Sequence, residues 1–175
     1  GGIYVVGGSV VIKDGLISGN KVTGGTISQC TGGGIIVHNT TLDIYGGTIQ
    51  NNIADRFGGG LYINASVVVN MYGGQFIGNE SVRGGGVYLN DGTFNLYDGY
   101  FTGNSADSAT DSGSAIYVRA RAFNMYGGVV TKNIANGNGA VYVGGPDIMT
   151  LYGGVIINNT IANLSGAGFA PNLGL

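Results

Sequence analysis

Tyr72-Gly73-Gly74-Gln75-Phe76-Ile77-Gly78-Asn79 is the stretch that decides the fold, because the chain repeats its pattern six times. Each copy has a residue expected at the surface, two turn residues, a short apolar step, and an asparagine seven positions after the first residue. The Asn-to-Asn steps are 32, 27, 25, 29 and 26 residues. A repeat of about 27 residues is typical of a solenoid. The asparagines are Asn20, Asn52, Asn79, Asn104, Asn133 and Asn159.

Three strand-like stretches recur in every repeat. The first has a Gly-Gly-apolar-Tyr-apolar pattern, as in 59–63, and the second alternates apolar and polar residues, as in Val69-Asn70-Met71. The third is centred on an apolar residue such as Phe76 and ends at the asparagine. Strict alternation is typical of a half-buried strand, and no segment has a helical period. We therefore predict an all-β fold, a parallel β-helix with about six coils of roughly 27 residues and three short strands per coil.

Two features of the repeat have a structural explanation. The second turn residue is glycine in all six copies and the first is glycine or aspartate, which favours a bend with positive φ. The six asparagines would stack as an internal ladder, because amide side chains hydrogen-bond up and down a parallel array. We interpret these asparagines as structural residues.

The composition restricts the classes of function. Of 175 residues, 37 are glycine, 43% are hydrophobic and only 9% are charged, with a net charge of -2. A core can form, and without a basic stripe nucleic acid is not an expected partner. Cys30 is the only cysteine, so neither an intrachain disulfide nor a thiolate cluster is expected. No apolar run approaches the roughly 20 residues of a membrane span. The chain opens in the middle of a repeat, so we expect residues 1–175 to be a single β-helix segment of a longer protein.

Tyrosines provide the clearest functional signal. If Ile3 and Val5 point inward, Tyr4 points outward, and so do its equivalents in later repeats. Outward aromatic stripes suit sugar stacking or protein docking, although stacked tyrosines can also simply stabilise a sheet. One expected ladder contains Tyr4, Ile36, Tyr62, Tyr88, Tyr117 and Tyr142, and a second contains Lys13, Tyr45, Tyr72, Tyr97, Tyr126 and Tyr152.

Charged residues supply weaker candidates. Arg56 and Arg83 lie four positions after their asparagines and are expected to stack in consecutive coils. They would either pair with neighbouring acids or bind a sulfated or sialylated sugar. Repeat length varies after the asparagine, so 21–32 and 105–113 are predicted corner loops, where the working face of a solenoid often lies. Asp107 and Asp111 share one such loop and are interpreted as solvated acids rather than a cation site.

Short motifs carry a resemblance over nearly the whole chain. Phe76-Ile77-Gly78-Asn79 and Phe101-Thr102-Gly103-Asn104 have the form Phe-x-x-Asn, and Gly139-Ala140-Val141 approaches Gly-Gly-Ala-Ile/Leu/Val. The repeat therefore resembles that of the chlamydial polymorphic outer-membrane proteins, and also Gly-Gly-Gly-Ile-Tyr-Val arrays in adhesin-like surface proteins. The resemblance implies a right-handed β-helix and an extracellular adhesin or stalk.

Two functional hypotheses follow. The first is a structural or adhesive segment of a surface protein or fibre, which binds host or matrix glycans or proteins and associates end to end. The second is a carbohydrate-active β-helix enzyme, which would need clustered carboxylates, with or without calcium. The nine acids of this chain do not gather, and His38 has no nucleophile that can be placed beside it. We therefore expect no catalytic residues, metal or cofactor, and favour the first hypothesis.

Overall fold

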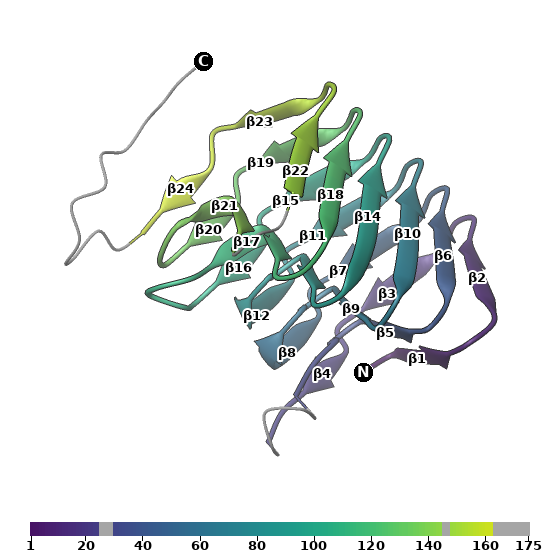
Figure 1. Cartoon of the computed structure of the whole chain (residues 1–175). Helices are drawn as coiled ribbons and strands as arrows, with labels where there is room; N and C mark the ends of the chain where they lie inside the picture. The colour runs from purple at the N-terminus through teal and green to yellow at the C-terminus, as the bar shows by residue number, and fades with distance from the viewer. Residues whose placement is uncertain (25–29, 145–147, 163–175) are drawn as a thin grey trace.

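The computed structural model describes residues 1–24, 30–144 and 148–162, and these form a right-handed parallel β-helix, as predicted. Four six-stranded sheets run along the solenoid, and every strand pairs in parallel with its equivalent in the next coil. Figure 1 shows the strands of successive coils lying one above another, from β1 (Ile3–Val6) at one end to β23 (Val155–Ile157) at the other. About five turns separate the first strand of a sheet from the last, slightly fewer than the six coils expected. The described residues contain no helix that could cross a membrane.

The first two sheets precede the double turn residue in each coil. The first sheet consists of β1, β5 (Ile35–His38), β9 (Leu61–Asn64), β13 (Val87–Leu89), β17 (Gly113–Val118) and β21 (Gly139–Val143). The second sheet consists of β2 (Ser9–Ile12), β6 (Thr41–Ile44), β10 (Val67–Met71), β14 (Gly92–Leu96), β18 (Ala122–Met125) and β22 (Ile148–Leu151).

The third sheet lies beyond the double turn residue and ends just before the ladder asparagines. It consists of β3 (Leu16–Ser18), β7 (Thr48–Gln50), β11 (Gln75–Ile77), β15 (Tyr100–Thr102), β19 (Val129–Thr131) and β23. Its central residues point into the core, where Phe76 and Phe101 stack with ring centroids 4.8 Å apart.

A fourth sheet corrects the prediction of three strands per coil. Its strands directly follow the asparagines, and two of them begin the segments 21–32 and 105–113 that are predicted as corner loops. Their common feature is one inward position, two residues after each asparagine, which is buried in the four interior coils at Ala54, Ser81, Ala106 and Ala135. One such position is too short a pattern to predict a strand, and backbone pairing with the neighbouring coil completes it. They are β4 (Lys21–Val22), β8 (Ile53–Phe57), β12 (Glu80–Arg83), β16 (Ser105–Ala106), β20 (Ile134–Ala135) and β24 (Thr160–Ile161).

The internal asparagine ladder is confirmed. The backbone N–H and the Nδ2 of Asn79 both donate to the Oδ1 of Asn104, each at 3.0 Å, while Nδ2 also donates to the Ile49 carbonyl at 2.8 Å. The pattern repeats from Asn20 to Asn159, and the four interior asparagines are completely buried. Each buried amide therefore links three coils through hydrogen bonds.

The double turn residues work differently from the expectation. Only the second residue has positive φ, for example 94° at Gly74. The first is glycine because of crowding, since a Cβ on Gly73 would lie 2.6 Å from the Tyr45 carbonyl oxygen. Where aspartate takes the first position, the following glycine shifts to φ of 116° at Gly15 and 134° at Gly99. The close stacking of coils therefore favours glycine at the first turn position, and we call the row of these turns the glycine corner.

Candidate binding surface

Five exposed tyrosines form a continuous row along the outer face of the second sheet, at the end of each strand. We call Tyr45, Tyr72, Tyr97, Tyr126 and Tyr152 the tyrosine ladder. Each follows an inward-pointing residue of the second sheet, so strand alternation turns its ring outward. Neighbouring rings stack with centroids 4.6–4.9 Å apart, and their exposed fractions range from 39% at Tyr97 to 66% at Tyr152. The second predicted ladder therefore exists as an exposed aromatic stripe.

Ring orientation limits what this ladder can offer to a partner. The interplanar angles lie between 2° and 17°, so the faces of the interior rings contact neighbouring rings. The outward surface therefore consists of ring edges and a row of phenol hydroxyls at the coil spacing of about 4.8 Å. Such a row can donate and accept hydrogen bonds along the solenoid axis.

A second polar row, missed by the sequence analysis, runs beside the tyrosine ladder. Asn124 donates from Nδ2 to the Oδ1 of Asn95, Asn95 donates to Asn70, and Asn70 donates to the Oδ1 of Asp43, each at 2.9 Å. All these amides donate in the same direction, and the row ends on a carboxylate. We call these four residues the outer amide ladder. The available signal was an Asp or Asn two positions before each of the first four ladder tyrosines, with Thr150 in that position before Tyr152.

The other predicted tyrosine ladder is largely covered, which corrects the expectation that it is exposed. Tyr88 and Tyr117 are only 3% and 6% exposed, although Tyr4 at the end of the row is 66% exposed. Phe57 stacks on Tyr88 with centroids 4.5 Å apart, and the Tyr117 hydroxyl donates to Asp111 at 3.2 Å. Tyr62 and Tyr142 are half-buried. The rings do point away from the core, but the corner segments of the fourth sheet fold over them.

The predicted stack of Arg56 on Arg83 is wrong. A β-bulge shifts the register between Ser81 and Arg83, so Arg83 pairs with Phe57 and lies 5.7 Å from the centre of that ring. Arg83 also forms an ion pair with Asp111 at 2.8 Å, while Arg56 is exposed. A one-residue shift was not visible in the spacing from the asparagines.

The Asp111 carboxylate accepts hydrogen bonds from four side chains at the corner between the fourth and first sheets. Burial would raise the pKa of Asp111, but hydrogen bonds from Arg83, Thr110 and Ser108 outweigh burial and lower that pKa below its ordinary value. The carboxylate also accepts the hydroxyl of Tyr117. The loop that contains Asp111 therefore packs over the first tyrosine row, and its carboxylate is occupied by these hydrogen bonds rather than free to bind a cation.

His38 belongs to another side-chain row. Its ring lies edge-on to Tyr4 with centroids 5.5 Å apart, and its Nδ1 is 3.2 Å from the Nδ2 of Asn64. Asn90 donates to Asn64 at 2.6 Å, and Arg119 donates to Asn90 at 2.7 Å. Among the described residues, no group of three or more His, Cys, Asp and Glu side chains is arranged to hold a metal ion.

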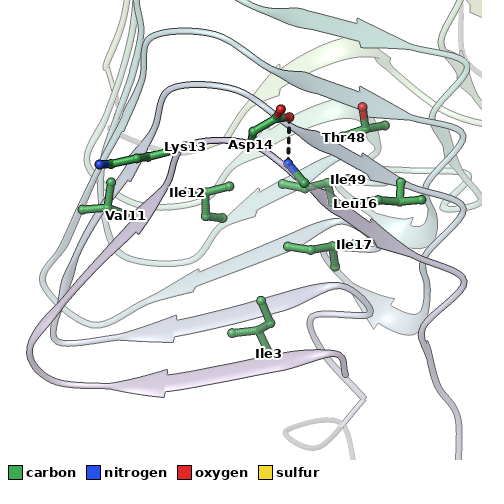
Figure 2. Close-up of a pocket in the computed structure, with 10 residues that line it drawn as sticks. Ile3, Val11, Ile12, Lys13, Asp14, Leu16, Ile17, Thr48 and Ile49 are labelled. Carbon is green, nitrogen blue, oxygen red and sulfur yellow. Dashed lines mark hydrogen bonds between the residues drawn. The ribbon is translucent and has the colours of Figure 1, made fainter.

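The described residues line a hollow at the first coil and another along the glycine corner. The first, of about 520 Å³, is the end of the core at the first coil, where Figure 2 shows Ile3, Ile12 and Ile17 pointing into the interior. Asp14 lies at its rim and accepts the backbone N–H of Gly15 at 2.7 Å. The second, of about 370 Å³, is a groove along the glycine corner between the second and third sheets. We call it the corner groove, and its lining is Asp14, Gly46, Gly47, Thr48, Gly73, Gly74, Gln75, Asp98, Gly99 and Tyr100.

Comparison of the chain with models of protein families, with curated proteins and with solved structures gives no match.

Proposed function

We propose that this chain is a structural and adhesive segment of an extracellular or cell-surface protein. The outer face of its second sheet, formed by the tyrosine ladder and the outer amide ladder, binds a host or matrix glycan or protein. The observation that carries the proposal is the continuous exposure of five stacked tyrosines along one face. The chain acts as a binding module and not as an enzyme.

The face combines two properties of a binding surface. Tyrosine offers a large amphipathic area at low conformational cost, and stacking on neighbouring coils already fixes the rings before any partner arrives. The neighbouring outer amide ladder is hydrogen-bonded within itself, so its amides are held in place as well. A preorganised face of this kind loses little entropy on binding.

The extracellular location rests on sequence properties and on the resemblance to surface adhesins. A chain with 9% charged residues and one buried cysteine fits a repetitive surface stalk. A solenoid also suits that role, because its length grows with repeat number while each coil presents the same face.

Adhesion of a ladder variant tests the proposal. Simultaneous replacement of Tyr72, Tyr97 and Tyr126 by serine should reduce adhesion to surfaces coated with matrix proteins or host glycans by about tenfold or more, because several aromatic contacts are lost. The matched control replaces Ile77, Thr102 and Thr131 by alanine, since they point outward from the third sheet in the same three coils. Equal loss in both variants, or no adhesion of the unaltered chain, would contradict the proposal.

The buried tyrosines need a separate treatment. Replacing Tyr88 or Tyr117 would disturb the packed corner, so a loss of binding there could reflect unfolding. Each ladder variant is therefore compared with the unaltered chain by chemical denaturation, and adhesion is scored only for variants that unfold cooperatively.

A further inference from the structure

The corner groove has features that stacking of the coils does not require. Its floor is the backbone of the glycine corner in consecutive coils, and one wall is a row of Thr48, Gln75 and Tyr100, which pair in register across β7, β11 and β15. Asp14 lies in the first coil and Asp98 in the fourth, which sets them about 14 Å apart along the axis at the usual spacing of coils. The groove is therefore elongated and parallel to the solenoid.

Backbone groups on the groove floor are already in use. The N–H of Thr48 donates to the Gly15 carbonyl at 2.8 Å, that of Gln75 to Gly47 at 2.9 Å, and that of Tyr100 to Gly74 at 3.0 Å. A peptide strand therefore finds no row of unpaired backbone groups to extend. What the groove offers to a ligand is its side chains.

Those side chains have free polar atoms. Within the described part of the chain, the Thr48 hydroxyl and the Gln75 amide make no hydrogen bond to protein. Each aspartate uses Oδ1 to accept the N–H of the following glycine at 2.7 Å, which leaves its Oδ2 open. A hydroxyl, an amide and two carboxylates suit a ligand that carries many hydroxyl groups.

Tyr100 differs from every other described aromatic residue. It is 51% exposed, and it is the one aromatic side chain of the described segments without a ring partner. The tyrosine ladder hides its ring faces in mutual stacking, whereas both faces of the Tyr100 ring remain free of other rings. A flat apolar ring face beside hydrogen-bonding side chains matches the apolar face and hydroxyl rim of a sugar ring.

Charge selects among sugars. The lining contains two carboxylates and no lysine or arginine. An anionic polymer would face like charges without a cation to offset them, which costs affinity. The charge pattern therefore favours neutral sugars over uronic, sulfated or sialylated ones.

We propose that the corner groove is a binding site for a neutral polysaccharide, which lies along the solenoid axis with one sugar ring stacked on Tyr100 and its hydroxyls bonded to Gln75 and Asp98. The site is separate from the tyrosine ladder. A neutral polysaccharide would also be a ligand through which the chain adheres, and in this respect the inference rests on the proposed adhesive function.

Calorimetric titration with neutral oligosaccharides tests the site, using cellohexaose, mannohexaose and chitohexaose, with an oligogalacturonate as the anionic comparison. At least one neutral probe should bind, and the oligogalacturonate should bind at least about tenfold more weakly. Tyr100→Ala should weaken the neutral probe by about tenfold, the loss expected for one aromatic contact. Val129→Ala is the matched control, because Val129 pairs with Tyr100 in the next coil and does not line the groove.

Asp98→Asn provides a second, charge-specific readout. It should reduce discrimination against the oligogalacturonate while the chain stays folded, as judged by chemical denaturation. Failure of all the neutral probes to bind, or equal affinity in Tyr100→Ala and the unaltered chain, would overturn the site. The two proposals fail separately. Adhesion lost in the tyrosine-ladder variant, with no neutral probe bound by the unaltered chain, overturns only the groove. Neutral-sugar binding that Tyr100→Ala weakens, with equal adhesion of the ladder variant and the unaltered chain, overturns only the ladder.

Discussion

At the residue scale, the position just before each ladder asparagine is left-handed in all six coils. Its φ lies between 52° and 68°. Glycine or asparagine, the residues that tolerate this region best, occupy five of the six positions. Lys132 is the exception, with φ of 56°. The positions are Gly19, Asn51, Gly78, Gly103, Lys132 and Asn158.

Lys132→Gly should therefore stabilise the chain. Removing the Cβ relieves the left-handed strain, and the gain, offset by the greater freedom of glycine in the unfolded chain, should be roughly 0.5–1 kcal/mol in the free energy of unfolding. Urea denaturation measures it. Thr131→Gly is the control. Thr131 lies in β19 with ordinary strand geometry, so the same change there should lower the free energy of unfolding of the chain. A Lys132→Gly chain no more stable than the original would contradict this explanation.

Burial of Tyr88 predicts a pH dependence of stability. Burial, together with smaller effects of neighbouring charges, raises the pKa of Tyr88 to about 12, from an ordinary value near 10. The Tyr88 hydroxyl therefore loses its proton at a lower pH in the unfolded chain than in the folded chain. As a result, the contribution of Tyr88 to the free energy of unfolding is complete below about pH 10 and is lost as the pH rises towards 12. Denaturation of Tyr88→Phe should show a smaller fall in stability over this window than the original chain. An identical fall in both would contradict the assignment.

At the element scale, the strands are too short to be stable alone, and what unites them is pairing between equivalent residues in successive coils. The asparagine ladder shows how such pairing acts. Each interior asparagine accepts two hydrogen bonds from one neighbouring coil and donates to two coils, so its removal affects several strands at once. The asparagines at the two ends are less buried, and their hydrogen bonds reach only one neighbouring coil.

Asn104→Ala should destabilise the chain by roughly 1–3 kcal/mol, because two buried donors on Asn79 lose their acceptor. Asn20→Ala is the matched comparison. Asn20 donates to Asn52 but accepts no hydrogen bond from a ladder neighbour, so its loss should cost less. Chemical denaturation of both variants checks the ranking, and equal stability of Asn104→Ala and the original chain would contradict the role of the ladder.

At the scale of the whole molecule, the two ends of the described solenoid differ from its middle. Leu151 is 59% exposed and Ile156 is 39% exposed, although their equivalents one coil earlier, Met125 and Val130, are fully buried. At the other end, the hollow in Figure 2 is lined by the inward residues of the first coil. Apolar, unpaired strand edges of this kind favour association.

We therefore expect this 175-residue chain to associate end to end in solution. Sedimentation velocity should show species that grow with concentration, and replacing Leu151 and Ile156 together by lysine should shift the distribution towards monomer. Replacing Val68 and Thr93 together by lysine is the control, because both lie on the outer face of interior strands of the second sheet, and it should not shift the distribution. A monomer throughout the concentration series would contradict the prediction.

The sequence by itself determined everything that depends on the repeat. A fixed seven-residue offset and strict alternation required equivalent residues to stack, so the parallel β-helix, the buried asparagine ladder and the outward row from Tyr45 to Tyr152 were all predictable. These features follow from local periodicity, and periodicity is visible along the chain.

Only the tertiary structure decided what lies at the corner after the asparagines. The bulge that places Phe57 rather than Arg56 beside Arg83, and the burial of Tyr88 and Tyr117, have no common pattern among the repeats. The fourth sheet has only a single shared inward position per coil, two residues after the asparagine, and it forms through pairing with neighbouring coils. Each depends on contacts between segments that differ in length and composition, such as Arg83 with Asp111, 28 residues further along. The corner groove has the same origin, because its lining comes from four coils and no single repeat contains it.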